Sequence, residues 1–195
     1  MIGGEDGETL GSPDKTGNPK QEFALRRSTE ADVAPIGIII NEAKEYLKEQ
    51  GSPQWQNGHE PHKAVIQTDI RKKASYVLTL KDEIVGTVAL ITEKDPVYEA
   101  IEGKWQGRDP DPYVALHHVA ISQSYRGIGL GKILLKKAIK QAQDLGYGDI
   151  RIDTYPANQP MLKLIEELGF TYRGMVYFPF EHGERKAFQL IQRVP

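Results

Sequence analysis

The residues with the clearest chemical potential form a glycine-rich turn near the middle of the chain. The turn reads Ser124-Tyr125-Arg126-Gly127-Ile128-Gly129-Leu130-Gly131-Lys132. Alternate glycines at the start of a helix let the backbone approach a ligand closely. The N–H groups of the first helical turn have no intrahelical acceptor, and the helix dipole makes that end positive. The turn therefore favours an anion such as a phosphate. Taken in isolation, the same glycines could also serve only to form a tight strand-to-helix connection.

Two familiar phosphate-binding loops do not match this turn. A P-loop has four residues between its first Gly and its Gly-Lys pair, and a Ser or Thr after the pair. Counted from Gly131-Lys132, the place of the first Gly is held by Arg126 and that of the Ser or Thr by Ile133. A dinucleotide fingerprint starting at Gly127 or Gly129 needs its third Gly at Lys132 or Leu134. Both loop types are excluded.

A histidine pair lies in the apolar segment before the turn, and imidazole can accept a proton near neutral pH. In a strand, His117 and His118 point to opposite faces and cannot share a metal ion, so we expect no metal site there. Because side chains alternate along a strand, His117 shares a face with Val119 and Ile121, unless a β-bulge before Val119 reverses the alternation. His118 then faces the opposite layer and is structural, which is also the more common role of a lone strand histidine.

The elements around the turn alternate strand and helix. Apolar spacing predicts a strand over 114–121, an amphipathic helix over 129–145 that Gly146 ends, a strand over 150–154, a helix over 161–168 and a final antiparallel pair over 170–176 and 187–192. The strands that flank the long helix form a βαβ unit, so we expect them to be parallel, with a right-handed connection.

The N-terminal half contributes further strands and two helices. We predict a strand over 23–26, a helix capped by Ser28 or Thr29 that ends near Gly51, a helix over 63–72, a hairpin of strands 76–80 and 84–91, and a long loop over 95–112. The fold class is α/β (α+β) with a mixed central sheet.

Composition limits the domain organisation and the function class. Residues 1–21 are rich in Gly, Pro and charge, so we expect a flexible tail before one domain over 22–195. The net charge of -2 argues against a nucleic-acid partner. No apolar run reaches the length of about 18 residues that spans a membrane, and residues 1–10 lack a secretory signal, so we expect a soluble cytoplasmic protein. The chain has no cysteine, which leaves oxygen and nitrogen chemistry.

The pattern Arg-x-x-Gly-x-Gly, filled by Arg126, Gly129 and Gly131, resembles the coenzyme A site of the GNAT superfamily, the Gcn5-related N-acetyltransferases. The segment Asp153-Thr154-Tyr155-Pro156-Ala157-Asn158 and the Leu-Gly-Phe ending at Phe170 also resemble the second cofactor-side segment of that family. The order of elements from 23 to 193 agrees too. The resemblance implies a GNAT-like acyl-CoA N-acyltransferase fold in which strands 119–121 and 150–154 splay apart.

The resemblance also implies a set of site residues for acetyl-CoA. Pantetheine would lie between the splayed strands, the pyrophosphate would bind the glycine turn, and a backbone N–H near Ile121 would polarise the thioester carbonyl. Asn158 would bind the pantetheine arm or order the adjacent loop. The implied cofactor residues are Val119, Ala120, Ile121, Arg126, Gly127, Ile128, Gly129, Leu130, Gly131, Lys132 and Asn158.

The chain departs from the family at one catalytic position. Many relatives have a Tyr four residues before the Gly of the Leu-Gly-Phe ending, where its hydroxyl can protonate the leaving thiolate, but Ile165 holds that place. Tyr155 or water could supply the proton, or the step needs no acid. For the base, some small-amine acetyltransferases of the superfamily have a histidine two residues before the Val119 position, which His117 matches.

We therefore expect transfer of an acetyl group from acetyl-CoA to a primary amine of a small molecule or a protein N-terminus, by direct attack. An acyl-CoA-binding sensor without turnover is the alternative. The loop around Trp55, with His59 and His62, either lines the acceptor site or packs structurally, and the aromatic residues of the 94–113 segment have the same standing: Tyr98, Trp105 and Tyr113. The expected partner is an amine acceptor, and a homodimer is left open.

Overall fold

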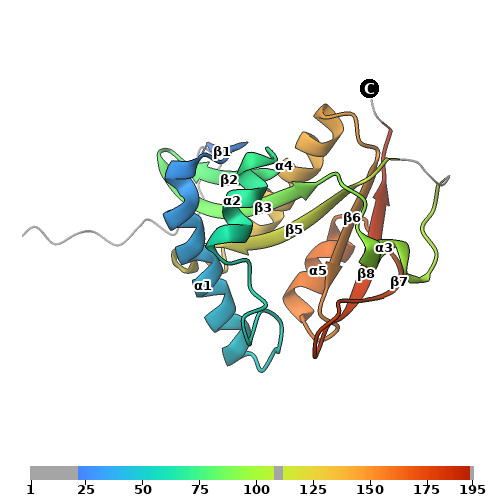
Figure 1. Cartoon of the computed structure of the whole chain (residues 1–195). Helices are drawn as coiled ribbons and strands as arrows, with labels where there is room; N and C mark the ends of the chain where they lie inside the picture. The colour runs from blue at the N-terminus through green and yellow to red at the C-terminus, as the bar shows by residue number, and fades with distance from the viewer. Residues whose placement is uncertain (1–21, 108–111, 194–195) are drawn as a thin grey trace, which may run out of the picture.

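The computed structural model of the chain describes residues 22–107 and 112–193. The tail predicted over 1–21 lies outside the described residues. The strands are β1 (Phe23–Arg27), β2 (Ser75–Leu80), β3 (Glu83–Ile91), β4 (Glu102–Gly103), β5 (Val114–Ile121), β6 (Asp149–Thr154), β7 (Thr171–Tyr177) and β8 (Glu184–Ile191). The α-helices are α1 (Val33–Glu49), α2 (Lys63–Arg71), α3 (Pro96–Glu99), α4 (Leu130–Asp144) and α5 (Gln159–Glu167). These elements confirm the mixed α/β fold class (Figure 1).

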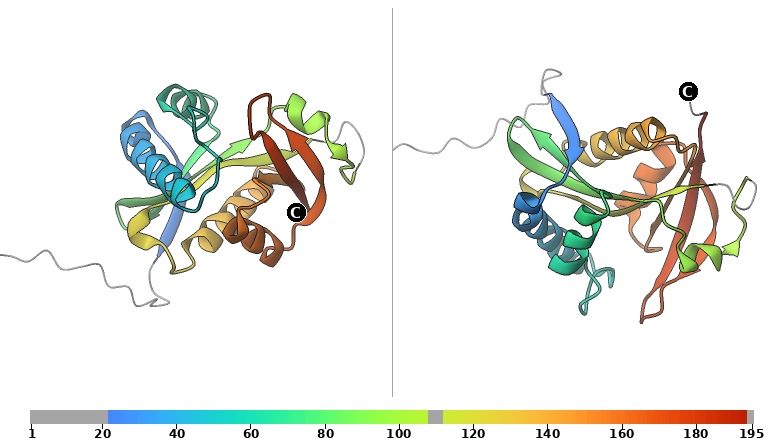
Figure 2. Two further views of the ribbon diagram at one scale, coloured as in Figure 1. Left: turned by 90° about the horizontal axis from the view of Figure 1, so that it is seen from below. Right: turned by 45° about the horizontal axis from the view of Figure 1, so that its top comes forward.

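The eight strands of the described ranges form one sheet in the order β1-β2-β3-β5-β6-β8-β7-β4. Helices α1 and α2 cover one face of its N-terminal half, and α4 covers the opposite face (Figure 2). The main core lies between the sheet and α4, where the inward side chains of α4 are fully buried because they recur at helical spacing. These side chains are Leu130, Leu134, Leu135, Ala138 and Ala142.

The first helix begins as the sequence predicts. Thr29 forms a capping box with Asp32, and the short 3-10 turn of Glu30–Asp32 leads directly into α1. The predicted hairpin is also present, since β2 and β3 pair in antiparallel fashion across Lys81 and Asp82. No helix in the described ranges is long and apolar enough to cross a bilayer.

The βαβ unit around α4 opens a gap in the sheet. β5 and β6 are parallel, as predicted, but they pair only from Val114 to Leu116 and from Ile150 to Ile152. Beyond these pairs β5 continues to Ile121 and β6 to Thr154 without pairing to each other. The predicted splay is therefore confirmed, and one edge of the C-terminal half of β5 is left unpaired by β6.

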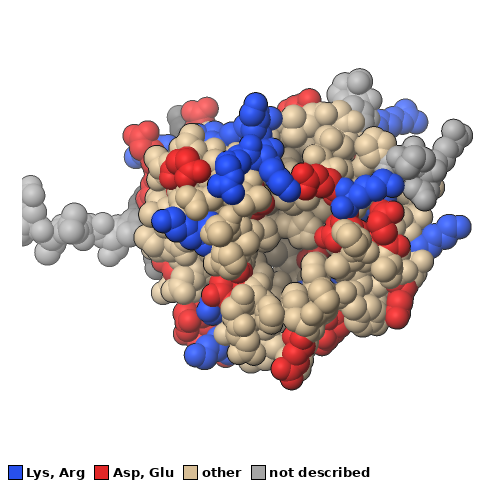
Figure 3. All heavy atoms as spheres, viewed as in Figure 1, with Lys and Arg blue, Asp and Glu red and all other residues tan. Residues whose placement is uncertain are grey.

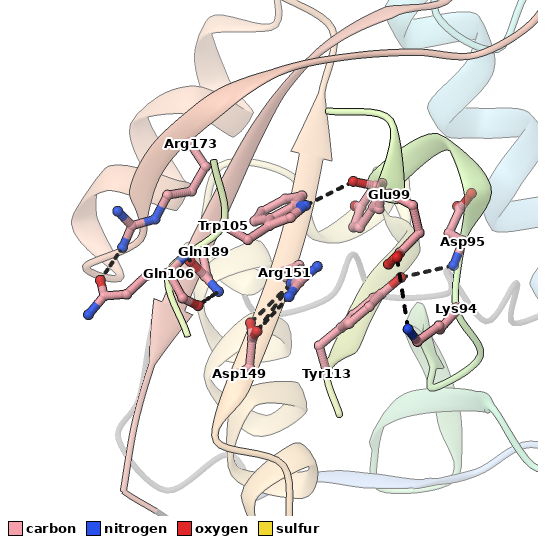
Figure 4. Close-up of polar contacts among 11 residues, drawn as sticks. Lys94, Asp95, Glu99, Trp105, Gln106, Tyr113, Asp149, Arg151, Arg173 and Gln189 are labelled. Carbon is pink, nitrogen blue, oxygen red and sulfur yellow. Dashed lines mark hydrogen bonds and ion pairs between the residues drawn. The ribbon is translucent and has the colours of Figure 1, made fainter. Parts of the chain in front are cut away.

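The segment predicted as one long loop over 95–112 contains a short helix, α3, and a short strand, β4, that pairs with β7. The guanidinium of Arg151 lies between the ring of Trp105 in this segment and that of Tyr113 just after it, 4.3 Å and 3.8 Å from the two ring centres (Figure 4). Its Nη2 also donates to Asp149 at 2.8 Å. The loop prediction was wrong here because these contacts come from β6, which is distant in sequence.

Candidate active site

The glycine turn has the geometry of an anion site. Gly127 and Gly129 adopt left-handed conformations, with φ of 86° and 81°, and Gly129 is the N-cap of α4. Such φ values favour glycine. The backbone amides of residues 127–131 have no hydrogen-bond acceptor among the described residues, so they remain available to a ligand.

A cleft of about 600 Å³ runs from this turn along β5, and we call it the glycine-loop cleft. Every residue that the resemblance assigned to the cofactor lines it except Ile128, whose side chain is on the surface. Its wall is completed by residues of α1, of the α1–α2 connection and of α5. These are Ala43, Tyr46, Leu47, Gln54, Trp55, Pro160, Met161, Lys163, Leu164 and Glu167.

Two contacts of this cleft join its opposite walls. The guanidinium of Arg126 lies 3.9 Å from the ring centre of Tyr46 on α1, which holds the cation in the wall of the cleft. Asn158 accepts a bond from the Met161 amide at the start of α5, and its Nδ2 donates to Oε1 of Gln54 at 3.3 Å. Tyr46 is not expected at the site from the sequence, because it lies on α1 and carries no motif. Gln54 belongs to the loop around Trp55, which the sequence indicates either as a wall of the acceptor site or as structural packing.

The two adjacent histidines do not point to opposite faces. His118 has a φ of 55°, and two residues of β5, His118 and Val119, oppose Val88 alone on β3, which is a β-bulge. The bulge reverses the alternation, so Val119 and Ile121 pack on the main core whereas Ala120 packs towards α1. The β-bulge that the sequence leaves open before Val119 is therefore present, and His117 does not share a face with Val119 and Ile121. The imidazole centres of His117 and His118 lie 6.0 Å apart.

Both histidines line a smaller cavity of about 170 Å³, the histidine pocket. Its other lining residues are Gln54, Trp55, His59, Pro61, Leu116, Val119, Ile152, Asp153, Thr154, Met161, Phe178, Phe180 and Arg185. In the same orientation as Figure 1, the surface is hollowed between the α1–α2 side and the β7–β8 side, and the hollow is walled mostly by uncharged atoms (Figure 3). His118 differs in its environment from His117, since its Nδ1 lies 2.9 Å from Oδ2 of Asp69 on α2.

A buried network supports His117. Its Nδ1 lies 3.8 Å from Oδ2 of Asp153, and the same oxygen accepts a hydrogen bond of 2.7 Å from the hydroxyl of Tyr98. Burial lowers the pKa of His117 below its ordinary value, and the charge of Asp153 opposes that shift. Burial, with the carboxylate beside it, raises the pKa of Tyr98 well above the ordinary value. His117 can therefore be neutral and ready to accept a proton at neutral pH.

The other residues singled out from the sequence fall in three places. Trp55 and His59 line the histidine pocket, where His59 stacks on Phe180 at 4.0 Å, whereas His62 is the N-cap of α2. Tyr155 is outside both cavities, with its ring centre 5.6 Å from the guanidinium of Arg185. Ile165 is fully buried in the main core.

Three residues of the β7–β8 hairpin were missed by the sequence reasoning, namely Phe178, Phe180 and Arg185. The resemblance is strongest on the cofactor side and carries no motif in the hairpin. Within the described ranges, no group of three or more His, Asp or Glu side chains is placed to hold a metal ion.

Comparison with known proteins agrees with this geometry. A family model described as the acetyltransferase (GNAT) family matches residues 40–170. The crystal structure of a GNAT-family acetyltransferase from Streptococcus agalactiae 2603 is 32% identical, has a TM-score of 0.78, and covers 89% of this chain and 97% of its own. A Salmonella typhimurium protein solved with its cofactor acetyl-CoA, 17% identical, shares the fold with a TM-score of 0.61 over 87% of this chain and 93% of its own.

Curated relatives are similar at lower identity. Human N-acetyltransferase 8B is 25% identical over 147 residues, which are 75% of this chain and 51% of that protein. Phosphinothricin N-acetyltransferase of Streptomyces viridochromogenes is 25% identical over 171 residues, 84% of this chain and 83% of that enzyme. The chain spans about half the length, or less, of the first curated relatives that it matches. From the extent of the family match and of the Streptococcus structure, we conclude that the chain belongs to the acetyltransferase (GNAT) family.

Proposed function

We propose that this protein transfers the acetyl group of acetyl-CoA to a primary amine of a small molecule or a protein N-terminus. The observation that carries the proposal is the meeting of the two cavities. Four residues line both the glycine-loop cleft and the histidine pocket: Gln54, Trp55, Val119 and Met161. A thioester that lies along the cleft would therefore end beside the histidines.

Successive regions of the cleft suit the successive parts of acetyl-CoA, from the pyrophosphate to the pantetheine arm. The unpaired amides of residues 127–131 and the guanidinium of Arg126 are suited to the pyrophosphate. The edge of β5 that β6 leaves unpaired is suited to the amide groups of the pantetheine arm. Asn158 stands on the other wall of the cleft, where it would bind that arm.

The reaction would need one base and one stabilised oxyanion. The amine nitrogen attacks the thioester carbonyl, so that a C–N bond forms and the C–S bond breaks, while His117 accepts the proton that the nitrogen loses. A backbone N–H near Ile121 would stabilise the oxyanion of the tetrahedral intermediate. Because Ile165 is buried and has no hydroxyl, the leaving thiolate would take its proton from water.

The size of the histidine pocket favours a small acceptor. Its volume of about 170 Å³ is below the range of roughly 300–1,000 Å³ for pockets that take drug-sized ligands. The assay is release of free thiol from acetyl-CoA with a panel of small primary amines and of peptides with free N-termini. Amine-dependent release is expected and should be fastest with small amines. Tight binding of acetyl-CoA without release for any amine would instead support the sensor.

A further inference from the structure

Arg185 is a buried cation in the wall of the histidine pocket. It lies at the β8 side of the hairpin, and its side chain is only 6% exposed. Its Nη1 donates to the backbone carbonyls of His182 and Glu184, both at 2.7 Å. These two bonds fix the orientation of the guanidinium and use only one of its three nitrogens.

The remaining edge of this guanidinium forms an ion pair but donates no hydrogen bond within the described part of the chain. Among the residues that the structure describes, neither Nε nor Nη2 of Arg185 donates a hydrogen bond. The nearest acid is Asp153, whose Oδ1 lies 3.9 Å from Nε, beyond hydrogen-bond range. The other oxygen of Asp153 is already engaged by the hydroxyl of Tyr98. A fork of N–H groups therefore remains open in the pocket.

This open edge has a specific chemical match. Nε and Nη2 lie side by side on the guanidinium and present parallel N–H groups that fit the two oxygens of a carboxylate. A buried charge is stabilised best when it is both paired and hydrogen-bonded, and the ion pair with Asp153 at 3.9 Å supplies no hydrogen bond. A carboxylate that accepts from Nε and Nη2 would supply two.

We propose that the acceptor is an amine that also bears a carboxylate, of the α-amino acid type, and that Arg185 binds the carboxylate. The inference rests on the proposed function and names the substrate class for it. Asp153 lies 3.8 Å from Nδ1 of His117 on one side and 3.9 Å from Nε of Arg185 on the other. The two groups of the acceptor must therefore lie close together, as they do in an α-amino acid.

The charges of the pocket also match a zwitterion. Arg185 would hold the carboxylate, while the carboxylate of Asp153 attracts the ammonium group towards His117, where it loses its proton. The rings of Phe178 and Phe180 lie 5.7 and 5.9 Å from the guanidinium carbon and give the rest of the acceptor an apolar wall. A simple amine would satisfy only half of this arrangement.

The test compares several α-amino acids, each with its carboxamide and its decarboxylated amine, for example L-leucine, L-leucinamide and 3-methylbutylamine. The wild type should prefer the amino acid in kcat/KM by about 10- to 100-fold, the range for hydrogen bonds to a charged group. Arg185→Gln should abolish that preference. Lys186→Gln is the matched control, because it removes a positive charge from the adjacent residue, which does not line the pocket, and should keep it.

The outcomes separate this inference from the proposed function. Equal or faster turnover of the carboxamides and amines by the wild type would overturn the carboxylate role and leave acetyl transfer intact. If none of the amines supports release of CoA, the proposed function is contradicted. Calorimetry of the same probes on the CoA-loaded protein would then decide whether Arg185 binds the carboxylate. If Arg185→Gln does not fold, Arg185→Lys keeps the charge without the fork and should lose most of the preference; full retention would overturn the inference.

Discussion

The carboxylate of Asp153 lies 3.8 Å from Nδ1 of His117 and accepts a 2.7 Å hydrogen bond from Tyr98 on the same oxygen. Burial lowers the pKa of His117, and Asp153 is the neighbour that most strongly raises it. The proton affinity of the proposed base is thus set by two opposed effects. This relationship makes the pH dependence of turnover a direct report on the histidine pocket.

Replacing Asp153 by Asn should move the acidic limb of the kcat/KM profile to lower pH. Removal of the negative charge leaves burial less opposed, so the pKa of His117 falls further and the neutral base persists to lower pH. The plateau rate should also fall, because a weaker base accepts the amine proton less readily. A limb that stays in place or moves to higher pH would show that His117 is not the titrating group.

The two histidines provide an internal comparison for the same profile. His117→Gln should lower kcat/KM by about 10²- to 10⁴-fold, the usual contribution of a general base, and remove its acidic limb. His118→Gln should keep the limb and shift it slightly to higher pH, because the charge of His118 lowers the pKa of His117. The reverse pattern would assign the base to His118.

Acetyl-CoA binding at the glycine turn should be weakened more by an added negative charge than by an uncharged side chain of the same shape. Gly129→Asp places a carboxylate at the start of α4, where the phosphate is proposed to lie, and should weaken acetyl-CoA by at least about 2 kcal/mol in calorimetry. Gly129→Asn has nearly the same shape without the charge and should weaken it less. A Cβ at this position meets nothing within 4 Å, but the φ of 81° strains any side chain. Asp and Asn tolerate this backbone region better than most residues and to a similar extent, so both variants should fold with the same modest loss of stability.

Gly146 offers the control for that comparison. It lies at the other end of the same helix with a φ of 90°, and a Cβ there also meets nothing within 4 Å. Gly146→Asp should leave acetyl-CoA affinity unchanged. If folded Gly129→Asp binds acetyl-CoA with the same affinity as the wild type, the pyrophosphate does not bind at the glycine turn.

Much of the cofactor side could be predicted because its signal is local. Glycines at a helix start, Arg126 and the apolar spacing of α4 lie within one continuous segment, and that segment folds as expected. The histidine pocket could not be predicted in the same way. The bulge at His118 depends on pairing with β3, and Arg185 enters the pocket from a hairpin that lies far along the chain. The structure in the 95–112 segment depends likewise on Arg151.

The contacts of Arg151 predict a large loss of stability on truncation. Asp149 and Arg151 form a buried ion pair, with side chains 10% and 8% exposed, and Arg151 also lies between two rings (Figure 4). Arg151→Met leaves a buried carboxylate without its partner and should lower the free energy of unfolding by about 3–5 kcal/mol in urea denaturation. Adding Asp149→Asn to Arg151→Met should restore part of the lost free energy of unfolding, because the unpaired carboxylate is then removed. A single variant as stable as the wild type would contradict this role.

The N-terminal ion pair should make stability depend on acid pH. Asp32 accepts bonds from Arg26 and from the Thr29 amide, and its pKa is lowered from 3.8 to about 2. Because the pKa of Asp32 is lower in the folded state, its ionised form stabilises the protein above about pH 4. That stabilisation is lost as the pH falls towards about 2. Asp32→Asn should therefore cost about 1 kcal/mol at neutral pH, since Arg26 is 45% exposed and water screens the pair. The cost should vanish near pH 2.

The central claim is that the acetyl group passes from the thioester in the glycine-loop cleft to an amine in the histidine pocket. The most direct measurement supplies acetyl-CoA labelled with ¹³C in the acetyl group, together with the amine that releases thiol fastest. Mass spectrometry then follows the label, and a thiol reagent follows free CoA. We expect one labelled amide for each CoA released, and Gly129→Asp should slow both equally. Release of CoA without a labelled amide would contradict the claim.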